Sequence, residues 1–266
     1  MINPMQMALI KKDVRSVSAN RNLFMALLIV PLIMTVVIPS IFLLIVGLTP
    51  IDSAEFHELL ALLPRGMLDS PDSDLRRSLM GMVINSIVPI FFLIVPIMAA
   101  SVMAASSFVG EKEKRTLETL LYCPLSLRQI FGAKVISSLV LSQFVSLVSF
   151  VAMTLVVQTE IWLITHSLML PGLNWLVLLI LVSPAISLVA ITLIVRGSAK
   201  AKTTEESQQR SAFLVLPIML LAVGQFTNIL MVNVWLLLGL GILCAVVGLF
   251  LLRRSSASFH YERLLL

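Results

Sequence analysis

The chain has 266 residues, of which 59% are hydrophobic and only 12% are charged, and its mean hydropathy is +1.03. A water-soluble domain carries about a quarter charged residues, so this composition indicates a chain that is solvated largely by a lipid bilayer. It excludes a disordered tail, a disulfide-built secreted module and a large catalytic domain. The net charge of +5 is assigned below to membrane topology rather than to nucleic-acid binding. The two cysteines, Cys123 and Cys244, predict free thiols.

Residues 1–22 predict a cytoplasmic amphipathic helix. Asn3 can cap it, Pro4 suits its first position, and Gln6 can complete a capping box. Its apolar stripe has helical spacing and consists of Met7, Ile10, Val14 and Val17. We expect this helix to lie in the membrane interface. It lacks the short apolar core and cleavage site of a signal peptide.

Six stretches are long and apolar enough to cross a membrane, which takes about 20 residues for a helix. The last two form one uncharged run that is too long for a single span, and a polar neck at Gln225, Asn228 and Asn233 divides it. The sequence therefore predicts an all-α integral membrane protein with a tail over residues 253–266 and six spans at Leu23–Leu48, Leu79–Ala105, Val135–Gln158, Leu173–Val195, Ser211–Met231 and Val234–Leu252.

The basic residues are distributed unevenly between the two sides of these spans. The side that includes both termini holds 16 of the 19 Lys and Arg residues, and the other side holds three. The first connection, residues 49–78, carries six acidic residues and a net charge of −3. The positive-inside rule therefore predicts that both termini are cytoplasmic, in a plasma-membrane protein. In the outer connection, Asp52 can cap a second amphipathic helix that ends at Pro64.

The second cytoplasmic connection combines charges with an apolar edge. From Gly110 to Ser126 it reads GEKEKRTLETLLYCPLS. Its leucines would share one side of a short helix, and Pro124 would end that helix. Composition alone favours the alternative, a solvated charged turn between two spans.

This string, followed by Gly132 and Lys134, resembles the signature of ABC transporter permeases of the ABC-2 type. The segment from Ser207 to Pro217 resembles the family's entry to its fifth span. The resemblance implies a permease half similar to the transmembrane domain of a type V ABC exporter, with an N-terminal elbow helix and a cytoplasmic coupling helix. It also implies two partners, a separate ABC ATPase subunit and a second permease subunit of the same or a different chain. The residues carried over to the ATPase-coupling helix are Glu111, Glu113, Arg115, Thr116 and Glu118.

The sequence holds no nucleotide-binding signature of its own. The G-x-x-x-x-G-K-[ST] pattern that cradles phosphates does not occur. His57-Glu58 is not followed by the second histidine that a zinc-protease helix requires. We therefore expect no catalytic residue, metal or cofactor in this chain, and expect ATP hydrolysis in a partner.

Serines recur on one face of the predicted third span, at Ser138, Ser142, Ser146 and Ser149. They are candidates for a translocation face, and the alternative is hydrogen bonding between helices. Prolines inside the spans predict kinks or hinges. These prolines are Pro31, Pro39, Pro89, Pro96, Pro184 and Pro217.

The function that these patterns favour is the permease subunit of an ATP-driven exporter. An ion-coupled secondary transporter or channel is the alternative, but such proteins usually hold ionisable residues near the bilayer midplane. An integral membrane enzyme would need a nucleophile and base, or a metal set, at one membrane depth. The transported substrate stays open between peptides, lipids, drugs and ions.

Overall fold

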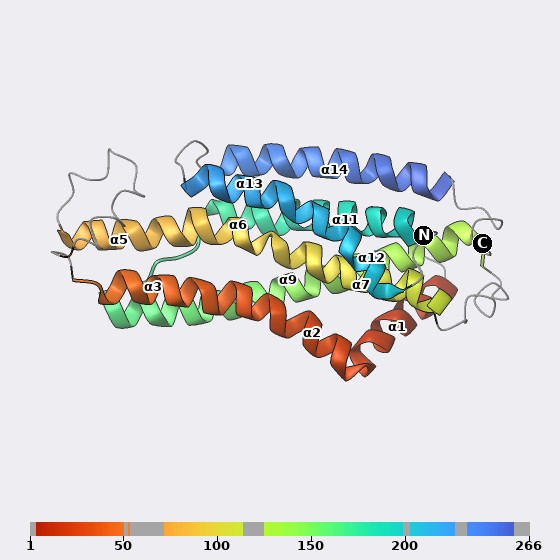
Figure 1. Ribbon diagram of the computed structural model, residues 1–266, viewed down its shortest axis with the longest axis horizontal. Coiled ribbons are helices and arrows are strands. Elements are labelled where there is room, and N and C mark those ends of the chain that lie inside the picture. The colour runs from red at the N-terminus through yellow and green to blue at the C-terminus, as the bar shows by residue number, and fades with distance from the viewer. Residues whose placement is uncertain are drawn as a thin grey trace.

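The structure is a computed structural model that describes residues 4–50, 53, 72–113, 125–198, 203–226 and 233–257. Within these ranges the chain is helical and contains no strand. Figure 1 shows an elongated bundle whose long helices lie along a common axis. In chain order the elements are α1 (Pro4–Ala19), α2 (Arg21–Leu32), η1 (Ile33–Val37), α3 (Ile38–Leu48), α5 (Asp72–Met82), η3 (Val83–Ile87), α6 (Val88–Phe92), α7 (Ile94–Glu113), α9 (Leu127–Thr165), α10 (Leu173–Val177), η4 (Leu178–Val182), α11 (Ser183–Ser198), α12 (Thr204–Ser211), η5 (Ala212–Leu214), α13 (Val215–Phe226) and α14 (Val234–Ala257).

Five helical stretches of the described chain are long and apolar enough to cross a membrane, and they coincide with five of the six predicted spans. The predicted fifth span coincides with a shorter apolar helix, Val215–Gln225. The five long stretches are Leu27–Leu48, Arg76–Glu111, Leu127–Thr165, Leu173–Ser198 and Val234–Ser255.

Successive long helices run in alternate directions along the bundle (Figure 1). Helix α1, the last turn of α7, the first turn of α9, helix α12 and the C-terminal end of α14 therefore gather at one end, which we call the α1 end. Helix α5 and the loop between α9 and α10 lie at the opposite end, which we call the α5 end. The two ends of the described chain thus lie at the same end of the molecule.

Three of the predicted kinks take the form of π-helical turns. Pro39, Pro89 and Pro184 each stand two residues beyond the last residue of a five-residue π-turn, η1, η3 and η4 respectively. Proline has no N–H to donate, and its ring clashes with the carbonyl four residues earlier. A widened turn relieves that clash without ending the helix.

The core surrounds the second candidate span. In its most apolar stretch 83% of the residues are buried, against 17% in the candidate span formed by α14. Phe92 and Trp175 are among the largest fully buried side chains, and their rings pack edge to face with centroids 5.3 Å apart. By contrast, α14 exposes large apolar side chains such as Trp235 and Phe250. An apolar exterior of this kind suits a lipid environment.

Helix α1 confirms the helix predicted for the N-terminal segment, and it packs on the bundle. Figure 1 shows that α1 folds back from α2 at a sharp bend. Leu9 and Ile10 form a small apolar cluster with Ile130 and Ala133 of α9. The predicted apolar stripe therefore contacts protein at Ile10, whereas Met7 is exposed. Its position in the membrane interface stays a prediction.

Two predicted helices fall largely outside the described residues. The outer amphipathic helix that begins at Asp52 lies in one undescribed range, and most of the predicted coupling helix lies in another. The described part of the latter, residues 110–113, forms the last turn of α7. The second span is thus continuous with the beginning of the charged connection.

Candidate functional site

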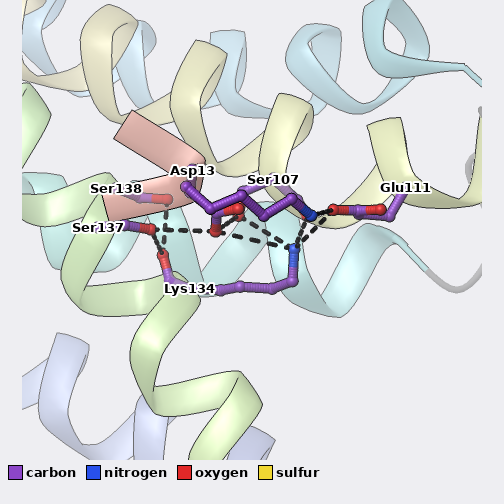
Figure 2. Close-up of polar contacts among 7 residues, drawn as sticks. Asp13, Ser107, Glu111, Lys134, Ser137 and Ser138 are labelled. Atoms are coloured by element: carbon purple, nitrogen blue, oxygen red, sulfur yellow. Dashed lines mark hydrogen bonds and ion pairs between the residues drawn. The ribbon is translucent and has the colours of Figure 1, made fainter. Parts of the chain in front are cut away.

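Six side chains from three helices form a polar cluster at the α1 end, and Figure 2 shows how Asp13, Ser107, Glu111, Lys134 and Ser137 converge. We call it the Lys134 cluster. Its members are Lys12 and Asp13 of α1, Ser107 and Glu111 of α7, and Lys134 and Ser137 of α9.

The local sequence of α9 sets the position of Lys134. Ser126 caps the helix, since its hydroxyl oxygen accepts a hydrogen bond from the Gln129 backbone N–H at 3.3 Å. The Gln129 side chain in turn accepts one from the Ser126 backbone N–H at 2.9 Å. This capping box fixes where α9 begins. Lys134 therefore falls on the second turn, directed toward α1 and α7 (Figure 2).

The Lys134 ammonium lies between two carboxylates. Its Nζ is 3.9 Å from Asp13 Oδ2 and 3.9 Å from Glu111 Oε1. It also donates a hydrogen bond to the backbone carbonyl of Ser107. The Phe108 ring lies on another side, with its centroid 5.7 Å from Nζ. The charge is therefore held by ionic, hydrogen-bonding and cation–π contacts together.

Asp13 is held equally closely. Its Oδ2 accepts hydrogen bonds from the hydroxyls of Ser107 at 2.9 Å and Ser137 at 3.4 Å, besides its pairing with Lys134. The side chains of Asp13 and Lys134 are only 6% and 4% exposed. Charges with so little access to water persist only when they are paired and hydrogen-bonded. The pair therefore ties α1 to α9 and α7 in one arrangement.

The cluster reaches the surface through a second ion pair. Lys12 Nζ donates to Glu111 Oε1 at 2.7 Å, and the Lys12 side chain is 54% exposed while that of Glu111 is 12% exposed. Two acidic and two basic side chains make the cluster formally neutral. Its neutrality and close pairing favour a structural joint over a site for a charged ligand.

Of the predicted coupling residues, the structure describes Glu111 and Glu113, and Arg115, Thr116 and Glu118 lie outside the described residues. Glu111 belongs to the Lys134 cluster. Glu113 is exposed, and its Oε2 accepts a hydrogen bond from the backbone N–H of Thr204 at 3.3 Å. The two acidic residues at the end of α7 thus contact different neighbours, α1 with α9 in one case and α12 in the other.

The predicted serine face lies in the interior of the chain. All four serines are buried, and three of them donate to carbonyls of their own helix, Ser138 to Lys134, Ser142 to Leu139 and Ser146 to Ser142. Beside them, Gln143 links α9 to α11 through Ser187 at 3.1 Å and Ser183 at 2.9 Å. This burial favours the alternative in which the polar face serves helix packing. Its part in a translocation route stays a prediction.

Four members of the cluster were not predicted as site residues from the sequence, namely Lys12, Asp13, Ser107 and Ser137, and Asp13 and Ser107 show why. Asp13 occurs on the same helical face as Leu9, Ile10 and Val17, all of which are buried. An acidic residue within a buried stripe indicates a cationic partner, and that signal could have singled it out. Ser107 carried no comparable signal, because one serine near the end of an apolar helix is unremarkable in sequence.

Comparison with known proteins places the chain in a family. A family model described as ABC-2 family transporter protein matches residues 7–249, a range that includes the whole Lys134 cluster. No curated protein and no solved structure matched the chain. Such permeases are the membrane components of ABC transporters, which couple them to an ABC ATPase. Because the described residues alone include five helices long and apolar enough to span a bilayer, this is an integral membrane protein, and the chain belongs to the ABC-2 family of transporter proteins.

Proposed function

We propose that the chain is the membrane-spanning permease subunit of an ATP-driven exporter that works with a separate ATP-binding subunit. Its family membership supports this assignment. The Lys134 cluster is the structural observation that carries it. That cluster joins the elbow-like helix α1, the second span and the third span beside the end of α7, where the predicted coupling segment begins.

The proposed topology has six crossings with both termini in the cytoplasm. Helix α13 would be the fifth crossing, continuing from α12 through the 3-10 turn η5. The alternating directions of the helices in Figure 1 support an even number of crossings, because both described ends lie at the α1 end. The excess of basic residues on that side supports a cytoplasmic α1 end.

The proposed mechanism follows from the joint. ATP binding closes the ATPase subunits, and their movement pushes the coupling segment that includes Glu111 and Glu113. Because Glu111 pairs with Lys12 and lies 3.9 Å from Lys134, a push on the end of α7 is carried at once to α1 and α9. Separating these helices would leave buried charges without their counter-charges, which is costly, so we expect the joined helix ends to move together.

A second permease half would complete the translocation route. The exposed apolar side chains of α13 and α14 offer faces for lipid or for that half, among them Leu220, Trp235 and Phe250. Export is the proposed direction. The candidate substrates remain peptides, lipids, drugs and ions, and the serine face of α9 would take part only if the helices around it separate during transport.

The direct test is to isolate the tagged chain from its native membrane in mild detergent and to identify the proteins that come with it. Recovery of an ABC ATPase subunit with ATP hydrolysis, at about one ATPase per permease chain, is expected if two permease halves work with two ATPase subunits. If the chain comes alone and inactive from several detergents, the exporter assignment is wrong and an ion-coupled transporter becomes the function to test.

A charge reversal at the coupling end tests the assigned interface. We expect Glu113→Lys to lower the amount of ATPase subunit recovered while membrane insertion is unchanged, because interface charges govern partner choice. Leu168→Lys is the control, since it adds a charge to an exposed loop at the α5 end. Equal ATPase recovery with both variants would contradict the assignment of Glu113 to the ATPase interface.

A further inference from the structure

We infer that a cavity between α1 and α7, beside the Lys134 cluster, binds the headgroup of phosphatidylethanolamine from the surrounding membrane. The inference rests on the proposed function for the position of the α1 end at a membrane surface, and it adds a lipid ligand to that function. It stands on the residues that line the cavity, on a basic groove beside it and on the apolar surface of α2.

The cavity lies between one face of α1 and one face of α7. Its volume is about 180 Å³, whereas about 10–15 Å³ suffices for one water molecule, so it can hold a group of several atoms. The α7 side is lined by Met103, Ser106, Ser107 and Gly110, which share one helical face by their spacing. Three of these four residues are small, and this leaves a space between the two helices.

The cavity offers acceptors that suit a primary ammonium group. Every contact described for the Asp13 carboxylate involves Oδ2, so Oδ1 is available to a donor in the cavity that Asp13 lines. The side chains of Ser16 and Ser106 line the same space. A primary ammonium carries three N–H donors, which match one carboxylate oxygen and two hydroxyls. A quaternary ammonium has no N–H and cannot make these bonds.

The charges around the cavity favour a ligand without net charge. Lys12 and Lys134 carry positive charge here, but Glu111 and Asp13 balance them. An ammonium alone would add an excess positive charge to this balanced set, and a phosphate alone would add an excess negative charge. Burying an unbalanced charge is costly. A zwitterion that carries both groups avoids that cost.

A basic groove along α1 provides the place for the phosphate. The groove shares Lys12 and Ser16 with the cavity, and Lys11 and Arg15 also line it. Lys11 and Arg15 are exposed, and the ion pairs of the described chain include neither of them. Both side chains can bind phosphate through charge-assisted hydrogen bonds. Together with Lys12, Asp13 and Glu111, they are all the charged side chains that line the cavity and the groove.

Apolar surface beside the site makes a membrane lipid the occupant. Helix α2 packs on both α1 and α7. This helix and the π-turn after it expose Met25, Ile29 and Ile33, whose four-residue spacing places them in one stripe. Exposed apolar side chains in a membrane-spanning segment suit contact with acyl chains. A phospholipid therefore supplies chains for α2, a phosphate for the groove and an amine for the cavity.

A headgroup at this place would strengthen the joint that the Lys134 cluster forms. It would contact α1 and α7 at once, next to the ion pair between Lys12 and Glu111. Ligands that bind only the folded state stabilise it. We therefore expect the bound lipid to raise the melting temperature of the purified protein.

Lipid titration of the purified transporter, followed by native mass spectrometry, tests the inference. The probes are the dioleoyl forms of phosphatidylethanolamine, phosphatidylcholine and phosphatidylglycerol, which share chains and phosphate and differ only beyond the phosphate. We expect phosphatidylethanolamine to bind several-fold more tightly than the other two. Equal binding, or tighter binding of either other lipid, would overturn the inference. Recovery of the ATPase subunit in the same preparation tests the proposed function separately, whatever the lipids do.

Substitutions on α1 locate the site. Ser16→Leu replaces a hydroxyl that lines the cavity, and we expect it to abolish the preference for phosphatidylethanolamine. Ser18→Leu is the matched control, because Ser18 is exposed on the same helix and lines neither hollow. Arg15→Gln should weaken all three lipids alike, since each carries a phosphate.

The other wall of the cavity gives an independent variant. Ser106→Leu fills the cavity from α7 and should also abolish the preference. Unchanged elution volume and helix content would show that each variant folds. A preference for phosphatidylethanolamine that persists in a folded Ser16→Leu or Ser106→Leu variant, or that is lost equally in Ser18→Leu, would overturn the assignment of the cavity.

Discussion

The two ends of the bundle are joined by different chemistry. At the α1 end, full charges on Asp13, Glu111 and Lys134 join three helices. At the α5 end, the Arg76 guanidinium donates a hydrogen bond to the Thr49 carbonyl at 2.7 Å, but the contacts made by the loop before α10 and by α10 itself join uncharged groups. The Asn85 side chain accepts a hydrogen bond from Gly172 N–H at 2.8 Å, and the Trp175 indole donates to a backbone carbonyl at 3.0 Å.

The hydrogen bonds that α10 makes at this end are explained by a proline. Pro89 has no N–H for the carbonyls of Asn85 and Ile84, which lie four and five residues earlier in the π-turn region. Trp175 Nε1 donates to Ile84 at 3.0 Å, and the Asn174 side chain donates to Asn85 at 2.8 Å. Helix α10 therefore satisfies backbone groups that the kink leaves open. The buried ion pairs lie at the end where the ATPase is proposed to act. At the other end, where the chain turns from α9 into α10, side chains donate hydrogen bonds to backbone carbonyls that the proline leaves without a partner.

The largest expected effect comes from removing the buried cation. We expect Lys134→Met to destabilise the protein by about 3–5 kcal/mol, because it leaves the buried Asp13 carboxylate without its counter-charge. The melting temperature of the purified protein in detergent measures this effect. ATPase recovery should fall with it, since α1 and α9 are no longer held to the end of α7.

The double variant Asp13→Asn with Lys134→Met sharpens that result. Removal of both charges should restore much of the lost stability, since neither is then buried alone. Melting measurements on the wild type, the two single variants and the double variant give the coupling energy between Asp13 and Lys134. Additive losses from the two substitutions would show that the ion pair does not hold the helices.

An intermediate effect is expected at the α5 end. Trp175→Phe keeps an aromatic ring beside Phe92 but leaves the Ile84 carbonyl without the indole N–H. We expect a loss of about 1–2 kcal/mol, the usual cost of an unmade hydrogen bond to a buried group. The melting temperature should fall while the amount of ATPase subunit recovered stays at the wild-type level. A loss of ATPase recovery would contradict the assignment of ATPase binding to the α1 end alone.

The smallest effect is expected at the exposed edge of the Lys134 cluster. Lys12→Gln removes the cation 2.7 Å from Glu111, but the Lys12 side chain is 54% exposed. An exposed ion pair contributes about 0–1 kcal/mol, and salt screens it. The shift in melting temperature should be near the error of measurement and should vanish in high salt. A shift as large as that of Lys134→Met would mean that this pair is not solvated.

Sequence periodicity and charge were sufficient for much of the fold. Five predicted spans coincide with long apolar helices, and the N-terminal helix is present as α1. The length of a span is fixed by the bilayer, so a run of apolar residues identifies it without any tertiary information. The form of the kinks was not predictable, because a proline can bend a helix or widen a turn depending on which neighbours satisfy the freed carbonyls.

The sequence by itself determined the class of protein, its family resemblance and the segment where charges gather. Only the tertiary structure decided which charges meet. Asp13 and Lys134 are 121 positions apart, and no local rule pairs them. Their pairing depends on how α1 folds back on α9. Likewise, the approach of Glu113 to Thr204 depends on the packing of α12 against α7. Contacts between distant segments are set by the packing of whole helices, which periodicity alone does not specify.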